Sequence, residues 1–230
     1  MNNLVMSSAS FGVAISLLAY YAGVQLKKKF KLGIFNPLLI SIILVMIFLL
    51  VTHVEYQTYY SGAKMLGWFL TPATVSLAIP LYSEVDRLKK NIKAIMISIF
   101  VGSLTSMGCI LIMSLLFGFS HAQFVTFLPK SITTAIGMSV SEELGGIVPI
   151  TVAAIVITGI LGNVIAESLL KLFKIEDPVA KGLAIGTSAH AIGTSKAMEI
   201  GETEGAMSSL SIVVAGIITV IGANIFAMFL

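Results

Sequence analysis

The sequence predicts an all-α polytopic membrane protein with about seven transmembrane helices, one re-entrant segment and an inverted repeat that contains two broken helices. Three observations support this fold class. Of the 230 residues, 57% are hydrophobic and only 11% are charged, too few to cover a soluble globular surface with ionic groups. The apolar runs are long and continuous, which excludes the alternating strands of a membrane barrel. Several of these runs nevertheless contain clustered Gly, Pro, Ser and Thr.

The apolar segments can be placed in order along the chain. The first ends in a run of lysines and has no small-residue cleavage site, so we expect a retained membrane segment rather than a signal peptide. Cys109 is the only cysteine and lies inside an apolar run, so no internal disulfide is expected. The segments are 8–26, 37–51, 64–82, 95–118, 123–143, 149–170, the polar stretch 186–204, and 207–230.

The lysines and arginines between the segments predict the topology. If every segment crosses the bilayer, the basic loops hold eight cations on one side and four on the other. If 123–143 instead enters and returns on one face, the split becomes eleven to one. Because short cytoplasmic loops are enriched in Lys and Arg, the second arrangement is favoured. It predicts an outer N-terminus, seven crossings, one re-entrant segment and a cytoplasmic C-terminus.

Internal repetition supports an inverted repeat with halves of roughly 32–118 and 144–230. Gly33 and Pro37 recur 112 residues later as Gly145 and Pro149. Thr74 recurs 120 residues later as Thr194. In the favoured topology the two halves run in opposite directions, and each has a broken helix in its middle. This arrangement is typical of secondary transporters.

Three interrupted segments, near 70–76, 128–134 and 186–204, combine helix breakers with hydroxyl residues. Half-helix N-termini present free N–H groups and a positive dipole end, which favours an anion. The alternative is that Gly and Ser pack helices closely while the lysines reach the interface. Ionisable groups inside a membrane are costly to keep, which favours a site. The candidate substrate-binding residues for a small organic anion are Thr71, Thr74, Lys130, Ser131, Thr133, Thr134, Ser188, His190, Gly193, Thr194, Ser195 and Lys196.

Other functional classes find less support in the sequence. The Gly-Thr-Ser-Ala-His run at 186–190 lacks the second Gly of a nucleophile elbow, so we expect no catalytic residues and no enzyme. Three scattered histidines and one cysteine have no metal-ligand spacing, so we expect no metal and no cofactor. The basic loops beside apolar segments indicate topology rather than nucleic-acid binding.

Four stretches resemble one family. The segments 70–82, 128–147, 157–163 and 181–212 are similar to those of the LrgB/CidB family, the antiholin-like and holin-associated membrane proteins of bacteria. The resemblance covers nearly the whole chain and makes residues 1–230 a single LrgB-like transmembrane domain. Many members have Gly in place of Thr71, Pro in place of Ala135 and Arg in place of Lys196. Lysine keeps the cation but loses bidentate recognition of a carboxylate.

The resemblance implies a multi-pass protein of the bacterial inner membrane that acts with a small LrgA/CidA-type membrane protein and modulates murein hydrolase activity and autolysis. Related proteins, including the plastid glycolate/glycerate translocator, move small hydroxy and keto acids. Two functions therefore stay open. One is a secondary transporter of monocarboxylates of the glycolate, pyruvate or lactate class, working as a monomer or a homo-oligomer. The other is a non-transporting regulatory or pore-forming subunit of a holin-like complex.

Overall fold

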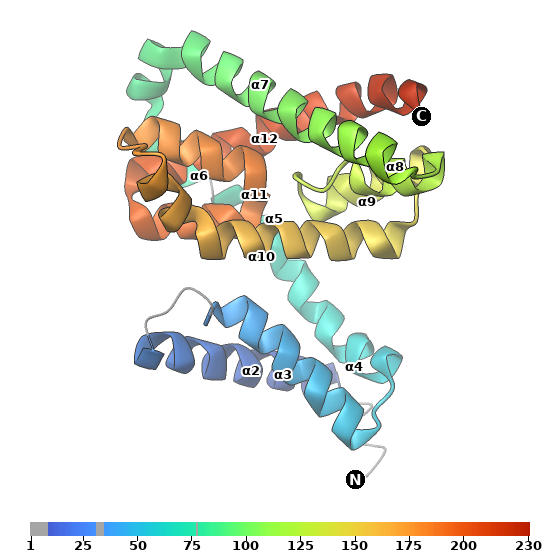
Figure 1. Ribbon diagram of the computed structural model, residues 1–230. Helices are drawn as coiled ribbons and strands as arrows, with labels where there is room; N and C mark the ends of the chain where they lie inside the picture. Colours follow the sequence, from blue (N-terminus) through green and yellow to red (C-terminus); the bar gives the residue numbers. More distant parts are fainter. Residues whose placement is uncertain (1–8, 31–34, 77) are drawn as a thin grey trace. The chain divides into compact units, whose positions relative to one another are not determined.

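A computed structural model describes residues 9–30, 35–76 and 78–230, and the described chain is helical (Figure 1). It forms two compact units, one up to Ser76 and one from Leu77 onwards. The first unit holds α2 (Ala9–Phe30), α3 (Pro37–Thr52), α4 (Tyr56–Ala63), η1 (Lys64–Phe69) and α5 (Leu70–Ser76). The second holds α6 (Ala78–Ser83), α7 (Val85–Phe117), α8 (His121–Phe127), α9 (Thr134–Glu143), α10 (Val148–Leu172), α11 (Pro178–Ile200), α12 (Glu202–Phe226) and η2 (Ala227–Phe229).

Helix α3 of the first unit begins at a well-formed cap. The Asn36 side chain accepts hydrogen bonds from the backbone N–H groups of Leu38 and Leu39, at 2.9 and 3.1 Å. Pro37 occupies the first turn, where its missing N–H costs nothing. Helix α2 packs on α3 at Gly23, where an added methyl group would lie 2.7 Å from the Pro37 carbonyl oxygen. Close approach of these two helices therefore depends on glycine.

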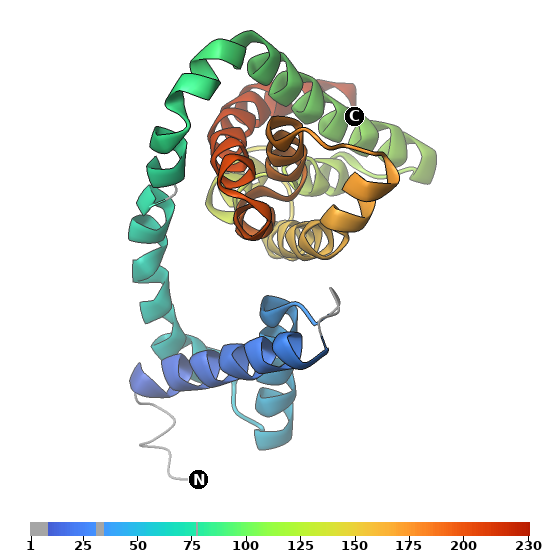
Figure 2. The same cartoon turned by 90° about the vertical axis from the view of Figure 1, so that its left-hand side faces the viewer.

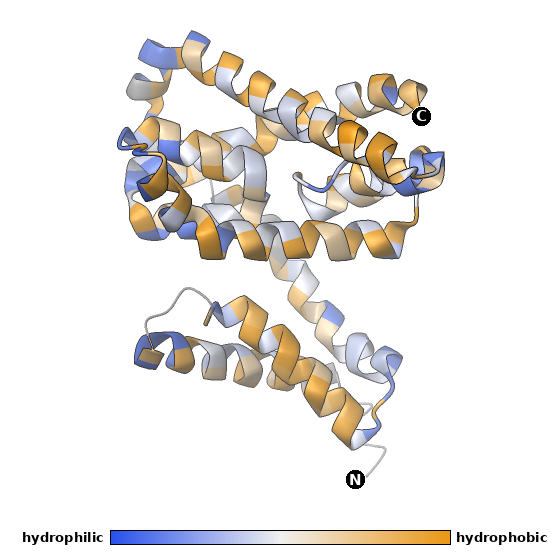
Figure 3. Ribbon diagram, viewed as in Figure 1, coloured by the Kyte–Doolittle hydropathy of each residue, from blue (hydrophilic) through white to orange (hydrophobic). Residues whose placement is uncertain are grey.

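Three helices in the described residues are long and apolar enough to cross a membrane. They cover Leu88–Phe117, Val148–Leu172 and Glu202–Phe229, with mean hydropathies of 2.2 to 2.4. They carry large exposed apolar side chains such as Leu116 and Ile217. Figure 3 shows hydrophobic residues along much of these helices. A soluble monomer rarely exposes so much contiguous apolar surface, whereas lipid solvates it. The predicted all-helical membrane class is confirmed, but the count of seven crossings is not.

One end of the second unit collects the starts of α7, α11 and α12 together with the end of α10. Lys181 of α11 lies 4.0 Å from Glu204 of α12. The Thr203 hydroxyl donates to Glu84, which immediately precedes α7, at 3.1 Å. Residues 173–177 link the end of α10 to α11. The basic segments 84–93 and 171–181 therefore lie at the same end, in agreement with the charge distribution of the sequence.

Helices α8 and α9 form a hairpin, defined here as the first hairpin, whose two ends meet. The ring nitrogen Nε2 of His121, the first residue of α8, donates to the carbonyl of Leu144, just after α9, at 3.2 Å. Residues 128–133 form the turn at its tip. The fold-back expected for 123–143 is thus present in the chain. Its open end lies at the start of α10, because only residues 144–147 separate the end of α9 from α10.

Helix α11 also folds back on itself, at His190, and residues 178–200 are called the second hairpin. The backbone of His190 has φ 42° and ψ −142°. A methyl group added to Gly193 would lie 3.2 Å from the Ile185 carbonyl oxygen, although eight residues of continuous helix span about 12 Å. The two arms therefore lie side by side. Figure 2, which turns the molecule by 90°, shows α7 passing across the outside of this region.

The fold-back of α11 corrects the predicted topology. The sequence predicted that this segment crosses the bilayer and that the C-terminus lies on the basic side. Instead α12 starts at the basic end and runs away from it, so Phe226 and Leu230 pack with Phe124 and Val125 of α8. The C-terminus therefore lies at the end opposite the basic segments. The prediction failed because hydropathy reports the length of a segment but not whether it turns back.

Candidate functional site

The tip of the first hairpin is held by buried hydroxyl groups. The Thr151 hydroxyl of α10 lies 2.9 Å from the Thr126 carbonyl oxygen and 2.7 Å from the Ser141 hydroxyl. These contacts join both arms of the hairpin to α10. At the tip, Lys130 Nζ donates to the Ser131 hydroxyl at 3.0 Å, and the Ser131 hydroxyl pairs with that of Ser106 on α7, also at 3.0 Å. The lysine is half-buried, and its hydroxyl partner Ser131 is itself held by α7.

The tip of the second hairpin is held at His190, whose side chain is only 2% exposed. Its ring nitrogen Nε2 donates to the Ile155 carbonyl at 2.9 Å. The Thr194 hydroxyl donates to the His190 carbonyl at 3.0 Å and pairs with the Ser208 hydroxyl at 2.7 Å. Because the backbone at His190 leaves helical geometry, the Thr194 hydroxyl provides a partner for the His190 carbonyl at the break, while the other two contacts hold the tip against α10 and α12.

The two tips approach the same turn of α10 from opposite ends of the second unit. His190 bonds to the backbone of Ile155, while a methyl group on Gly137 of α9 would lie 2.5 Å from Ile155 Cδ1. The first hairpin opens at the start of α10, and the second opens beyond its end. Two oppositely directed hairpins that meet beside a spanning helix place interrupted backbone in the interior of the unit. Interrupted backbone at such depth is tolerated where protein or a polar cavity surrounds it.

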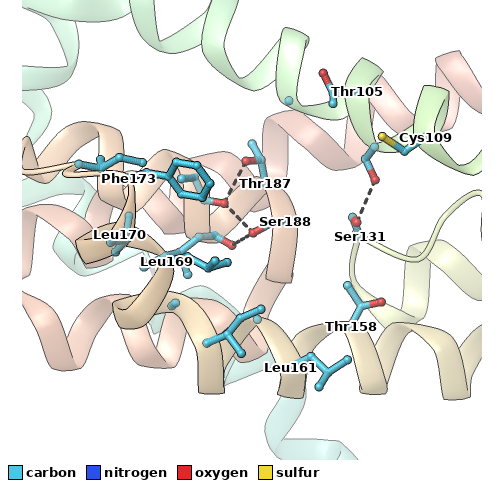
Figure 4. Close-up of a pocket in the computed structure, with 18 of the residues that line it drawn as sticks. Thr105, Cys109, Ser131, Thr158, Leu161, Leu169, Leu170, Phe173, Thr187 and Ser188 are labelled. Atoms are coloured by element: carbon cyan, nitrogen blue, oxygen red, sulfur yellow. Dashed lines mark hydrogen bonds between the residues drawn. The ribbon is translucent and has the colours of Figure 1, made fainter.

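A cavity of about 680 Å³ lies beside the two tips (Figure 4). Its polar lining comes from α7, the tip of the first hairpin, α10 and α11, and the rest is small or apolar. In Figure 4, Ser131, Cys109 and Thr158 lie toward one end and Leu169, Leu170 and Phe173 toward the other. The polar lining residues are Thr105, Ser106, Cys109, Lys130, Ser131, Thr158, Thr187 and Ser188.

Lys130 is the charged group of this cavity. Of the described residues that line it, none is an Asp or a Glu. Within the part of the chain that the structure describes, no ion pair joins Lys130 to a carboxylate. A half-buried ammonium without a protein counter-ion favours an anion from outside. The cavity therefore provides one cation and several hydroxyl groups, which suits one carboxylate.

Lys196, the other predicted cation, has protein partners. Its ammonium lies 2.5 Å from Glu167 of α10 and 3.2 Å from Glu199 of its own helix. Lys196 is absent from the described cavity lining. The pairing fastens the return arm of the second hairpin to α10, as does Asn163, whose Nδ2 donates to the Ile192 carbonyl at 2.9 Å. A role of Lys196 in substrate binding stays a prediction that competes with this structural one.

The remaining predicted residues fall into three groups: some line the cavity, some hold the helices together, and some have side chains outside the described residues. Ser131 and Ser188 line the cavity beside Lys130. Thr133 occupies the N-cap position of α9 and Thr134 begins the helix. Gly193 packs within the second hairpin, whereas Thr194 pairs with Ser208 of α12 and Ser195 accepts from Asn163 of α10. The predicted half-helix start at 193–195 is displaced, because the break falls at His190. The break predicted in 70–76 falls where η1 ends at Phe69 and α5 begins at Leu70. The side chains of Thr71 and Thr74 lie outside the described residues.

Sequence reasoning missed the contributions of α7 and α10 to the site. Ser106 and Cys109 are three residues apart on α7 and share a face, yet they lie in an ordinary apolar run. Asn163 and Glu167 left a usable signal, since they are polar residues spaced four apart within a spanning helix. That spacing places both on one helix face, and their partners lie on α11. The signal indicates a packed polar helix face.

Together the fold and the cavity define a helical membrane protein with a partly open, cation-bearing cavity beside two hairpin tips. The chain belongs to the LrgB-like family, whose model matches residues 16–229. It is 39% identical over 221 residues to proteins named antiholin-like protein LrgB from Bacillus mycoides (strain KBAB4) and Bacillus cereus (strain B4264), covering 96% of each chain. The protein of that name from Bacillus anthracis (strain CDC 684 / NRRL 3495) is equally similar. No solved structure matches the chain.

Proposed function

We propose that the protein is a secondary carrier of small organic monocarboxylates, of the glycolate, pyruvate or lactate class, and that Lys130 binds the carboxylate. The observation that carries the proposal is the Lys130 ammonium, which has no ion pair in the described residues and lies in a cavity without a described acidic lining residue. A single cation balances a single carboxylate, while a second carboxylate would lie desolvated without a partner. The reaction is movement rather than catalysis, so no residue is assigned a catalytic role.

The arrangement of the hairpins supports a carrier. Carriers commonly hold substrate near the bilayer midplane at interrupted helices, where half-helix ends and loop backbone face the ligand. Here the cavity adjoins two hairpin tips beside the middle of a 25-residue spanning helix, α10. The positive-inside rule places the basic end of the second unit in the cytoplasm and the C-terminus outside. The predicted inverted repeat does not extend to the last helices of its two halves, because α7 and α12 both start at the basic end. Thr71 and Thr74 remain candidate residues of the proposed site.

A second function is favoured by the names of the relatives, which are antiholin-like proteins. In this alternative the chain is a regulatory or pore-forming subunit of a holin-like complex of the bacterial inner membrane. It controls murein hydrolase activity and autolysis with an LrgA/CidA-type partner or as a homo-oligomer. Both functions are compatible with each other, because a carrier that changes the balance of organic acids and protons influences lysis indirectly.

Uptake into liposomes tests the carrier directly. Purified full-length protein is reconstituted and offered labelled pyruvate, glycolate or lactate, with and without internal substrate. We expect saturable uptake and counterflow, and a loss of at least about tenfold in Lys130→Gln, because a charge-assisted hydrogen bond contributes roughly 1.5–3 kcal/mol. Lys171→Gln is the matched control, since the Lys171 side chain is 80% exposed and lies at the end of α10.

The results separate the two functions. Uptake that is equal in Lys130→Gln and wild type removes Lys130 from the site. Release of unrelated dyes from the liposomes indicates a pore. If the chain shows neither uptake nor leakage alone but changes autolysis when expressed with its small partner, the regulatory subunit is the correct function.

A further inference from the structure

Within the proposed carrier function, we infer that the cavity prefers monocarboxylates with an apolar tail, such as branched short-chain 2-oxo acids, over polyhydroxylated acids of equal size. The inference starts from the shape of the cavity. Along α10 its lining runs from Thr158 to Phe173, fifteen residues or about 22 Å of helix. A volume of about 680 Å³ falls in the range of pockets that hold drug-sized ligands. A three-carbon acid at Lys130 would occupy only one end.

The lining changes character along this length. Near Lys130 it carries Ser131, Cys109 and Thr158, while Phe173 and Leu170 lie toward the far end (Figure 4). The apolar wall begins one turn from Thr158 on α10, so it lies within reach of a tail of a few carbons. It consists of Leu161, Gly162, Ile165, Ala166, Leu169, Leu170, Phe173 and Ile175 on the α10 side, and Ala184 and Ile185 on α11.

The hydroxyl groups of α11 do not offset this apolar character. The Thr187 hydroxyl donates to the Leu183 carbonyl at 2.6 Å, and the Ser188 hydroxyl donates to the Ala184 carbonyl at 2.7 Å. Their protons are therefore committed to their own helix. At the tip, Ser131 already accepts from Lys130. A ligand hydroxyl facing α11 could donate to these oxygens but would receive no hydrogen bond from them, so its own oxygen would lose a donor that water supplies.

Energetics give the expected size of the preference. Moving one methylene from water onto an apolar wall gains about fourfold in affinity. The series pyruvate, 2-oxobutanoate and 2-oxopentanoate should therefore bind about fourfold more tightly at each step, with 4-methyl-2-oxopentanoate tighter again. Glycerate should bind about fivefold or more weakly than lactate, because it differs by one hydroxyl that needs a partner.

The single cysteine provides a binding assay that does not require transport. Cys109 lines the cavity and is exposed, and the chain has no other cysteine. Purified full-length protein is treated with a maleimide in the presence of each acid, and the concentration that halves the labelling rate is measured. We expect protection to strengthen along the series. Neutral 4-methylpentanamide should not protect, and Lys130→Gln should lose protection by every acid.

A matched pair of variants locates the apolar wall. Leu161 and Ile157 lie one turn apart on α10 with side chains 55% and 56% exposed, but of these two only Leu161 lines the cavity. In Leu161→Asn, each added methylene should increase the affinity for the acid only about twofold. In Ile157→Asn the increase should stay near fourfold. This outcome supports the inference.

Other outcomes overturn it. If all acids protect Cys109 equally and Lys130→Gln abolishes this protection, the preference for an apolar tail is refuted while the proposed carrier function stands. If both asparagine variants behave alike, the tail does not contact this wall. If no acid protects Cys109 and Lys130→Gln labels like wild type, the anion site and the proposed function fail together with the inference.

Discussion

Replacing Lys196 by Gln separates a structural lysine from a substrate-binding one. The lysine side chain is 17% exposed and its partners Glu167 and Glu199 are 46% and 49% exposed. Exposed ion pairs contribute roughly 0.2–1 kcal/mol, and breaking a buried pair costs about 3–5 kcal/mol. Because the lysine is largely buried while its two carboxylate partners are half-exposed, we expect Lys196→Gln to lower the free energy of unfolding by about 1–2 kcal/mol. In a unit of this size that lowers Tm by roughly 2–8 °C.

The measurement is a double-mutant cycle in detergent-solubilised protein. Lys196→Gln removes the cation from two carboxylates, so it should destabilise more than Glu167→Gln, which leaves Lys196 paired with Glu199. The double variant should be less destabilised than the sum of the single ones, with a coupling energy of about 1 kcal/mol. Thermal unfolding and protection of Cys109 by pyruvate are measured on the same samples.

Two results would refute a structural role for Lys196. The first is additivity, in which the double variant loses as much stability as the two single variants together. The second is a Lys196→Gln variant with unchanged Tm that no longer binds any acid. That second result would return Lys196 to the substrate site that the sequence predicted and would show that its pairing with Glu167 opens when substrate enters.

Two further predictions concern the backbone of the second hairpin. Gly186→Ala should destabilise the protein by about 1–3 kcal/mol in thermal unfolding, since the new methyl group would lie 2.5 Å from the Ser208 carbonyl oxygen. Gly108→Ala on α7 meets nothing within 4 Å and should be neutral or stabilising by up to about 1 kcal/mol. His190→Ala should lower the unfolding free energy by about 1–3 kcal/mol through the lost bond to Ile155. His190→Gly should cost about 1 kcal/mol less than His190→Ala in the same assay, because glycine adopts φ 42° without strain.

Opposite outcomes would contradict this geometry. If Gly186→Ala and Gly108→Ala have the same Tm, α11 and α12 do not approach each other closely at Gly186. A glycine at position 190 that is no better tolerated than alanine would show that the backbone there does not adopt a positive φ.

The membrane class and the approximate positions of the helices could be predicted from the sequence, because hydropathy and helix-breaking residues are properties of short stretches of chain. The apolar run 149–170 corresponds to α10, and Pro129 lies in the turn of the first hairpin. Helix α7 begins at Val85, ten residues before the predicted apolar run. Half of the added residues are charged, and most are good helix formers. Hydropathy marks only the part of a helix that lipid would cover.

Composition and local pattern alone therefore determined a helical membrane protein, the interruptions near residues 130 and 190, and Lys130 as a costly buried cation. Only the tertiary structure decided that α11 returns at His190, because the turn is held by the Ile155 carbonyl, 35 residues earlier. It also decided that Lys196 is neutralised by Glu167 while Lys130 keeps no described acidic partner. Which charges are paired depends on residues that are distant in the sequence and become neighbours only when the helices pack.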